Sequence, residues 1–272
     1  MVSTTTMIIM IACVLVGIAT LAIPYIMISR RSSNLETGLP GAVGYGFLGY
    51  IWQYIIYMFL GLFLMRMPFL QSMNKTFAEV LVNILLTLVT TGCTAASLYW
   101  GLYLTNQKQI SIYRSAAVGI GYSLGKMGMD LIYPYIYSVY FSIQINGGTF
   151  QADKGIKNSI LSTTNGELIS GTYKCILMFV IVFAITLVMG NYYIEKNKKM
   201  AWLSVLVSYE IIMLLNVILR YVTGGAFDIV FMIVFTVIAA AGGVVLYHWF
   251  KTGEVEKNPI VIVKRLGGTA GK

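Results

Sequence analysis

The sequence has few charged residues. Asp, Glu, Lys and Arg together make up 11% of its 272 residues, while 58% are hydrophobic. A soluble globular chain carries roughly a quarter charged residues, because its folded surface must still be wetted by water. This scarcity of charge excludes an ordinary soluble domain. Lipid is the solvent that removes the need for a polar surface, so the composition predicts an integral membrane protein.

Histidine and cysteine are also scarce. The single histidine is His248, and the three cysteines are Cys13, Cys93 and Cys175. One histidine excludes a zinc site of the HExxH kind, and the cysteine spacing indicates neither a disulfide framework nor a metal site. No Walker loop, GxSxG motif or rhomboid-like Ser/His pair is present. The sequence therefore predicts no metal ligands and no cofactor.

Long apolar stretches recur along nearly the whole chain, and a bilayer-spanning helix needs about 20 mostly apolar residues. They predict an all-α, polytopic membrane helix bundle in a single domain, residues 1–250. Seven spans are expected, at 7–29, 39–65, 77–104, 115–143, 174–194, 200–222 and 226–250. The first lacks a cationic start and a small-residue cleavage site, so it is read as a retained helix. Residues 144–173 form a polar external loop and residues 251–272 a basic cytoplasmic tail.

Basic residues fix the expected orientation. The net charge is +9, and membrane proteins collect Lys and Arg in their cytoplasmic loops, so this excess does not indicate nucleic acid as a partner. With the N-terminus outside, twelve Lys and Arg lie on the inner side and six on the outer side, with Lys126 inside the membrane. The bias predicts an external N-terminus and a cytoplasmic C-terminus.

Ionisable side chains within a span are costly and are therefore functional candidates. Lys126 and Asp130 are four residues apart in the fourth span, which stacks them on one helix face within pairing distance. Lys126 and Glu210 both lie roughly 15–17 Å from the inner ends of their helices, near the bilayer midplane. The depth predicts a polar cluster of Lys126, Asp130 and Glu210. Two readings stay open: a functional polar site, or a charge pair that satisfies itself and fixes the helix register.

Glycine spacing marks the same span. Gly121 and Gly125 are four residues apart, and Gly128 follows nearby. Small residues at this spacing let helix backbones approach closely, so we expect the three glycines to pack the Lys126 helix at the centre of the bundle.

Two segments resemble a known family. The end of the second span reads Leu-Met-Arg-Met-Pro-Phe-Leu-Gln at residues 64–71, and residues 122–130 read Tyr-Ser-Leu-Gly-Lys-Met-Gly-Met-Asp. They resemble the Arg-Ile-Pro-Leu-Leu and Tyr-Gly-Leu-Gly-His-Gly-Gly-x-Glu motifs of the YhfC-like membrane proteins. That family is regarded as glutamic-type intramembrane proteases, related to the CAAX-processing and bacteriocin-immunity membrane proteins. The resemblance implies a protease-like fold of seven spans with an external N-terminus.

The reacting groups that the resemblance implies are missing. Ala95 and Ala96 stand where the family has a Glu-Glu pair, with no Arg following in the span, and Lys126 and Asp130 replace the His and Glu of the second motif. The family's late His is lost around Glu210. We therefore expect a non-catalytic pseudoprotease that binds a membrane protein or a transmembrane peptide. Its expected surroundings are a bacterial, Gram-positive plasma membrane, by analogy only.

Two alternatives remain. The chain could be a small transporter, or a transporter accessory subunit, that uses its midplane charges as an ion or proton site. It could also be an active intramembrane protease with a shifted site, in which Asp130 and Glu210 act as acid and base and Lys126 stabilises an oxyanion.

Overall fold

The computed structural model describes residues 1–31, 38–105, 112–151, 153–194, 197–223 and 226–251. The expected cytoplasmic tail, apart from Lys251, lies outside these residues. The described chain folds into helices, in the order α1 (Thr4–Arg31), α2 (Leu39–Met65), α3 (Pro68–Gln71), α4 (Lys75–Thr105), α5 (Ile112–Met127), the π-helical turn η1 (Gly128–Ile132), α6 (Tyr133–Asn146), α7 (Lys154–Ser162), α8 (Asn165–Ile194), α9 (Lys198–Thr223) and α10 (Phe227–Lys251).

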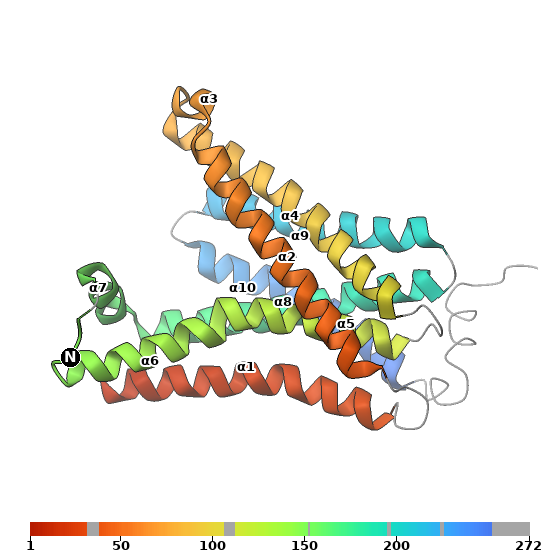
Figure 1. Cartoon of the computed structure of the whole chain (residues 1–272), viewed down its shortest axis with the longest axis horizontal. Coiled ribbons are helices and arrows are strands. Elements are labelled where there is room, and N and C mark those ends of the chain that lie inside the picture. The colour runs from red at the N-terminus through yellow and green to blue at the C-terminus, as the bar shows by residue number, and fades with distance from the viewer. Residues whose placement is uncertain (32–37, 106–111, 152, 195–196, 224–225, 252–272) are drawn as a thin grey trace, which may run out of the picture.

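Six of these helices are long and apolar enough to cross a membrane: α1, α2, α4, α8, α9 and α10. The span expected at 115–143 falls on α5, η1 and α6, which follow one another without interruption. None of these three pieces is by itself long enough for a bilayer, but together they run beside α1 along its length (Figure 1). The chain is therefore an integral membrane protein built as a polytopic helix bundle.

The expected external loop, 144–173, is largely helical. It contains α7 and the first turns of α8, which begins at Asn165 and not at residue 174. A reciprocal capping box starts α8: the Thr164 N–H donates to Glu167 Oε2 at 2.8 Å, and the Glu167 N–H donates to Thr164 Oγ1 at 3.2 Å. The polar residues just before position 174 therefore belong to the start of α8 and not to an irregular loop.

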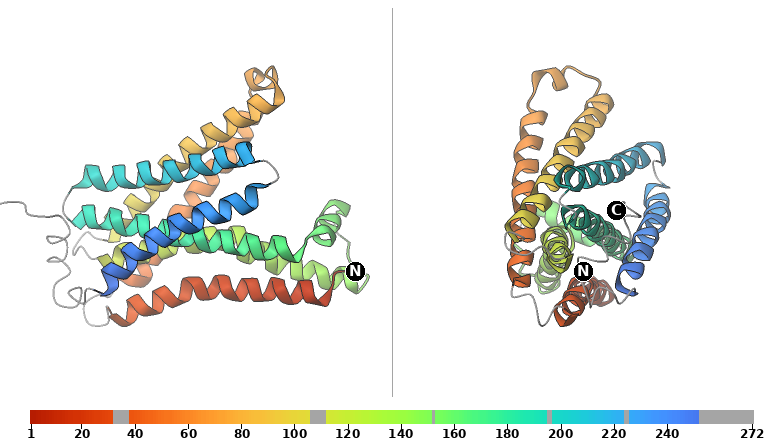
Figure 2. Two further views of the ribbon diagram at one scale, coloured as in Figure 1. Left: turned by 180° about the vertical axis from the view of Figure 1, so that it is seen from behind. Right: turned by 90° about the vertical axis from the view of Figure 1, so that its right-hand side faces the viewer.

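The helices fall into two groups that diverge toward one end of the bundle. α1, the α5–η1–α6 run and α8 lie together, while the hairpin of α2 and α4 leans away from them (Figure 1). α9 and α10 complete the bundle against α8 and α4 (Figure 2). The N-terminus, α3 and α7 lie at the diverging end, and the α1, α4, α8 and α10 C-termini lie at the opposite end.

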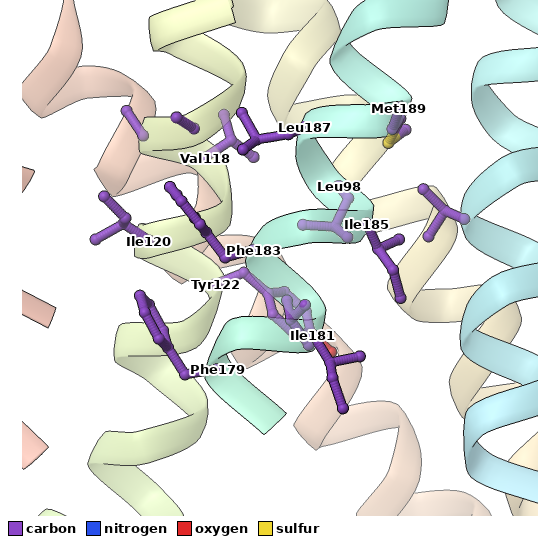
Figure 3. Packing of buried hydrophobic residues seen from close by; sticks show 14 of the residues in the cluster. Leu98, Val118, Ile120, Tyr122, Phe179, Ile181, Phe183, Ile185, Leu187 and Met189 are labelled. Atoms are coloured by element: carbon purple, nitrogen blue, oxygen red, sulfur yellow. The ribbon is translucent and has the colours of Figure 1, made fainter. Parts of the chain in front are cut away.

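The core lies between α5 and α8, with α4 beside them. Tyr122 of α5 and Leu98 of α4 are fully buried, and Phe179 and Phe183 of α8 stack with ring centroids 5.7 Å apart (Figure 3). α8 is the most buried of the six spanning helices. This central helix gives the bundle a fixed wall against which the other elements are positioned.

Glycines let α2 and α5 cross at backbone distance. A Cβ at Gly121 would overlap the Val43 carbonyl oxygen, and a Cβ at Gly46 would overlap the Val118 carbonyl oxygen. The crossing therefore has a glycine on each helix, facing the backbone of the other. Only glycine permits this approach, because any side chain would force the two helices apart.

The other two glycines of the expected packing group differ from each other. A Cβ at Gly125 would lie 2.6 Å from a ring carbon of Tyr50 on α2, so Gly125 belongs to the same contact. Gly128 has open space where a Cβ would stand, because it begins η1, beyond the crossing. Gly128 was expected to pack against a neighbouring helix, and its surroundings do not show this contact.

Candidate functional site

The site begins at the π-helical turn η1. The Tyr133 N–H donates to the Gly128 carbonyl, five residues earlier, in place of the α-helical partner four residues earlier. Pro134 follows, and a proline has no N–H and its ring clashes with the carbonyl of the residue four positions before it, here Asp130. The wider turn relieves this clash, and π-turns of this kind recur at functional positions in helices.

Lys126 and Asp130 form an ion pair at this turn. Lys126 Nζ lies 2.9 Å from Asp130 Oδ2, one turn along the helix. The two side chains keep 27% and 42% of their surface exposed, so the pair faces open space and not the core. Each charge is satisfied locally, and both remain reachable from that space.

The open space is a cavity of about 500 Å³. It lies between α2, α4, α9 and α10, with Lys126, Asp130 and Lys174 on the side of α5, η1 and α8. Polar side chains make up much of its wall: Tyr50, Gln53, Tyr54 and Tyr57 of α2, Asn83, Thr87 and Thr90 of α4, and Tyr209, Asn216, Arg220 and Tyr221 of α9. Small-molecule sites typically have volumes of about 300–1,000 Å³, so the cavity can hold a polar headgroup or a short stretch of peptide.

Cations outnumber carboxylates on the wall. Lys126, Lys174 and Arg220 line the cavity, and Asp130 is the one carboxylate among the described lining residues. Lys174 is ion-paired with Asp228 at the start of α10. Its ammonium group also lies over the rings of Phe227 and Phe231 of α10, 5.5 and 5.7 Å from their centroids. The wall therefore favours an anionic or hydrogen-bonding ligand.

A buried hydrogen-bond chain fixes the α2 wall to α5. The Tyr122 hydroxyl donates to Gln53 Oε1, and it lies 2.9 Å from Thr94 Oγ1 of α4. Tyr122 is fully buried, whereas Gln53 reaches the cavity. The core thus orients a polar group at the cavity surface.

Glu210 does not join Lys126 and Asp130. Glu210 is absent from the described residues that line the cavity, although its neighbour Tyr209 is among them. Its Oε1 atom is buried and has no hydrogen-bond partner among the residues that the structure describes. The expected three-residue cluster is therefore reduced to the pair.

Sequence reasoning missed most of the lining. Tyr50, Gln53, Tyr54 and Tyr57 follow the i, i+3, i+4, i+7 spacing of one helix face. A polar stripe on an otherwise apolar span is the signal that identifies this wall. Lys174 is the first residue of one expected span, and Arg220 lies near the end of another.

Within the described residues, no three His, Cys, Asp or Glu side chains come together as a possible metal site. His248 belongs to α10, but its side chain lies outside what the structure describes. No family model, curated protein or solved structure matches the chain.

Proposed function

We propose that this integral membrane protein is a non-catalytic binding protein of the plasma membrane, with an intramembrane-protease-like fold. Its ligand is a short segment of a partner membrane protein, held in the polar cavity beside Lys126 and Asp130. The observation that carries the proposal is the cavity itself, a polar space lined by helices that are otherwise apolar.

The chemistry of the wall suits a peptide. A segment that leaves its helical conformation inside a bilayer must find partners for its backbone N–H and C=O groups. The cavity offers both donors and acceptors from Gln53, Asn216, Thr90 and the tyrosine hydroxyls. About 500 Å³ accommodates a short unwound stretch, not a whole helix.

The arrangement of the helices supports lateral entry. α2 packs along α4 and crosses α5, and within the described chain it makes no extended contact with α6 or α10. α2 and α6 diverge from the crossing (Figure 1). Tyr57 of α2 lines the cavity and keeps 43% of its surface exposed, so the wall is reachable from outside the bundle.

The ion pair favours binding over acid–base chemistry. Lys126 holds the Asp130 carboxylate at 2.9 Å, and Glu210 is not among the described residues that line the cavity. An acid–base pair needs two groups that can reach one substrate. The shifted-protease alternative assigned those roles to Asp130 and Glu210, and the positions of these two residues do not support it.

Site-specific photo-crosslinking tests the proposal. A photoreactive amino acid replaces Tyr54, which lines the cavity, and in a control protein it replaces Phe59, which lies on the same helix with 71% of its surface exposed. After irradiation in native membranes, we expect a specific membrane-protein adduct from position 54 and lipid or no adduct from position 59.

Substitution of the ion pair provides a second part of the crosslinking experiment. Asp130→Asn in the position-54 protein is expected to abolish the adduct, while Glu210→Gln leaves it unchanged. Equal adducts at both positions, or no protein adduct at position 54, would overturn the proposal. Ion flux through proteoliposomes that is lost on Lys126→Met substitution would favour the transporter alternative instead.

A further inference from the structure

One positive charge at the mouth of the cavity has no counterpart. Lys126 is matched by Asp130, and Lys174 by Asp228. Arg220 lines the same cavity, has an exposed side chain, and forms no ion pair with a described residue. The mouth of the cavity therefore carries the net positive charge.

This mouth lies where a spanning helix meets the headgroups. Arg220 is in the last turn of α9 and Asp228 in the first turn of α10, on either side of the connection between them. Helix ends at this position lie at the membrane–water interface, where lipid headgroups are within reach. A ligand of the mouth can therefore come from the bilayer itself.

Hydrogen-bond donors accompany the guanidinium. The Asn83 amide donates to the Tyr221 hydroxyl oxygen at 2.6 Å, which leaves the Tyr221 hydroxyl proton free to donate in turn. Both residues line the cavity. A guanidinium with a hydroxyl donor beside it suits the oxygens of a phosphate group, which Arg binds through two parallel hydrogen bonds.

Apolar rings complete the mouth. Phe227 and Phe231 of α10 line the cavity next to Lys174. They offer contact to the carbon chains that a headgroup carries, whereas a free phosphate ion would gain nothing from them. Polar donors and apolar rings together match an amphiphile with one uncompensated negative charge.

We infer that the mouth of the cavity binds the phosphate diester of an anionic phospholipid from the outer leaflet. Arg220 and Tyr221 hold the phosphate oxygens, and the acyl chains stay in the bilayer. The site goes beyond the proposed function, because it uses the mouth of the cavity and not the Lys126–Asp130 end.

Native mass spectrometry of the purified full chain tests the site. The protein is titrated in detergent with phosphatidylglycerol, which is anionic, or phosphatidylcholine, whose headgroup cation compensates the phosphate. We expect wild-type protein to prefer phosphatidylglycerol. Arg220→Gln should weaken phosphatidylglycerol binding roughly tenfold, the effect of losing one charge-assisted hydrogen bond, and Arg220→Lys should retain part of the preference.

Arg66→Gln is the matched control. Arg66 caps the end of α2, has an exposed side chain and does not line the cavity, so its loss should leave lipid binding unchanged. Equal binding of both lipids, an unchanged preference in Arg220→Gln, or an equal loss in Arg66→Gln would overturn the inference. Displacement of phosphatidylglycerol by inorganic phosphate would assign the site to a free anion and overturn it as well.

The two proposals fail independently. Asp130→Asn should remove the partner adduct and leave the lipid preference intact, whereas Arg220→Gln should remove the lipid preference. If Arg220→Gln unfolds at the same temperature as the wild type, the variant is folded, and a loss of lipid binding then reports on the site.

Discussion

Lys126 Nζ lies 2.9 Å from Asp130 Oδ2, and the pair joins the end of α5 to the π-turn that follows it. The glycine contacts hold α5 against α2 at the centre of the bundle. The pair is thus fixed by the most closely packed helix crossing, although its charges face a cavity. The effect of the ion pair on stability can therefore be measured separately from any effect of the pair on binding.

Removing one partner of the pair should destabilise the protein more than removing both. Lys126→Met leaves the Asp130 carboxylate without its cation, and because both side chains are partly exposed we expect the free energy of unfolding to fall by about 0.5–1 kcal/mol. Lys126→Met/Asp130→Leu removes both charges and should recover part of this loss. Unfolding in mixed micelles compares wild type, Lys126→Met and the double variant, and a double variant that is no more stable than Lys126→Met would contradict the expectation.

The helix crossing should be sensitive to a single methyl group. Gly121→Ala places a Cβ against the Val43 carbonyl oxygen, so α2 and α5 must move apart, at a cost of about 1–3 kcal/mol. Gly128→Ala adds the same methyl group in open space and serves as the control. Thermal unfolding in detergent compares them, and equal losses would show that the crossing does not need its glycine.

The buried hydroxyl of Tyr122 should contribute to stability through Gln53. Tyr122→Phe keeps the ring and deletes the hydroxyl, which leaves the Gln53 carbonyl without this donor; the expected loss is about 1–3 kcal/mol. Tyr99→Phe is the control, since the Tyr99 hydroxyl forms no hydrogen bond with a described residue and its ring packs edge-on to Tyr193. Urea unfolding checks the difference, and equal stability of the two variants would contradict it.

Cysteine labelling should test the predicted orientation. With Cys13, Cys93 and Cys175 replaced by alanine, Ser159→Cys lies in α7 and Asn197→Cys lies just before α9, at opposite ends of the bundle, and both native side chains are exposed. An impermeant maleimide applied to intact cells should label position 159 at once and position 197 only after permeabilisation. The reverse pattern would place the N-terminus inside.

Helix positions were largely predictable because apolar length determines them. The expected span 39–65 has the same bounds as α2, and the spans expected at 7–29 and 200–222 fall within α1 and α9. The i, i+4 spacing of Lys126 and Asp130 also sufficed for the pair, since both residues lie on one helical run. Local chain geometry carries this information, with no need to know how the helices pack.

Directions around a helix were not predictable in the same way. Glu210 was expected beside Lys126 and Asp130, but the described cavity lining includes Tyr209 of α9 and not Glu210. In an apolar-all-round helix, hydrophobic periodicity does not reveal which side faces a neighbour, because lipid and protein interior are equally apolar. The α7 helix was missed for another reason: its residues are polar, and its start depends on the side chain of Asp153, which accepts from the Gly155 N–H at 2.7 Å.

The π-turn gives the α5–η1–α6 run one residue more than a regular α-helix of the same axial length would have. Deleting one residue from Gly128–Ile132 would restore regular α-helical winding and turn all of α6 by about a quarter of a revolution relative to α5. Tyr135, whose hydroxyl now donates to the Leu168 carbonyl of α8, would leave its partner, and the outer half of the helix would present a new face to α1 and α8. In genetic terms, the fold should tolerate a substitution in this five-residue segment far better than a change in its length.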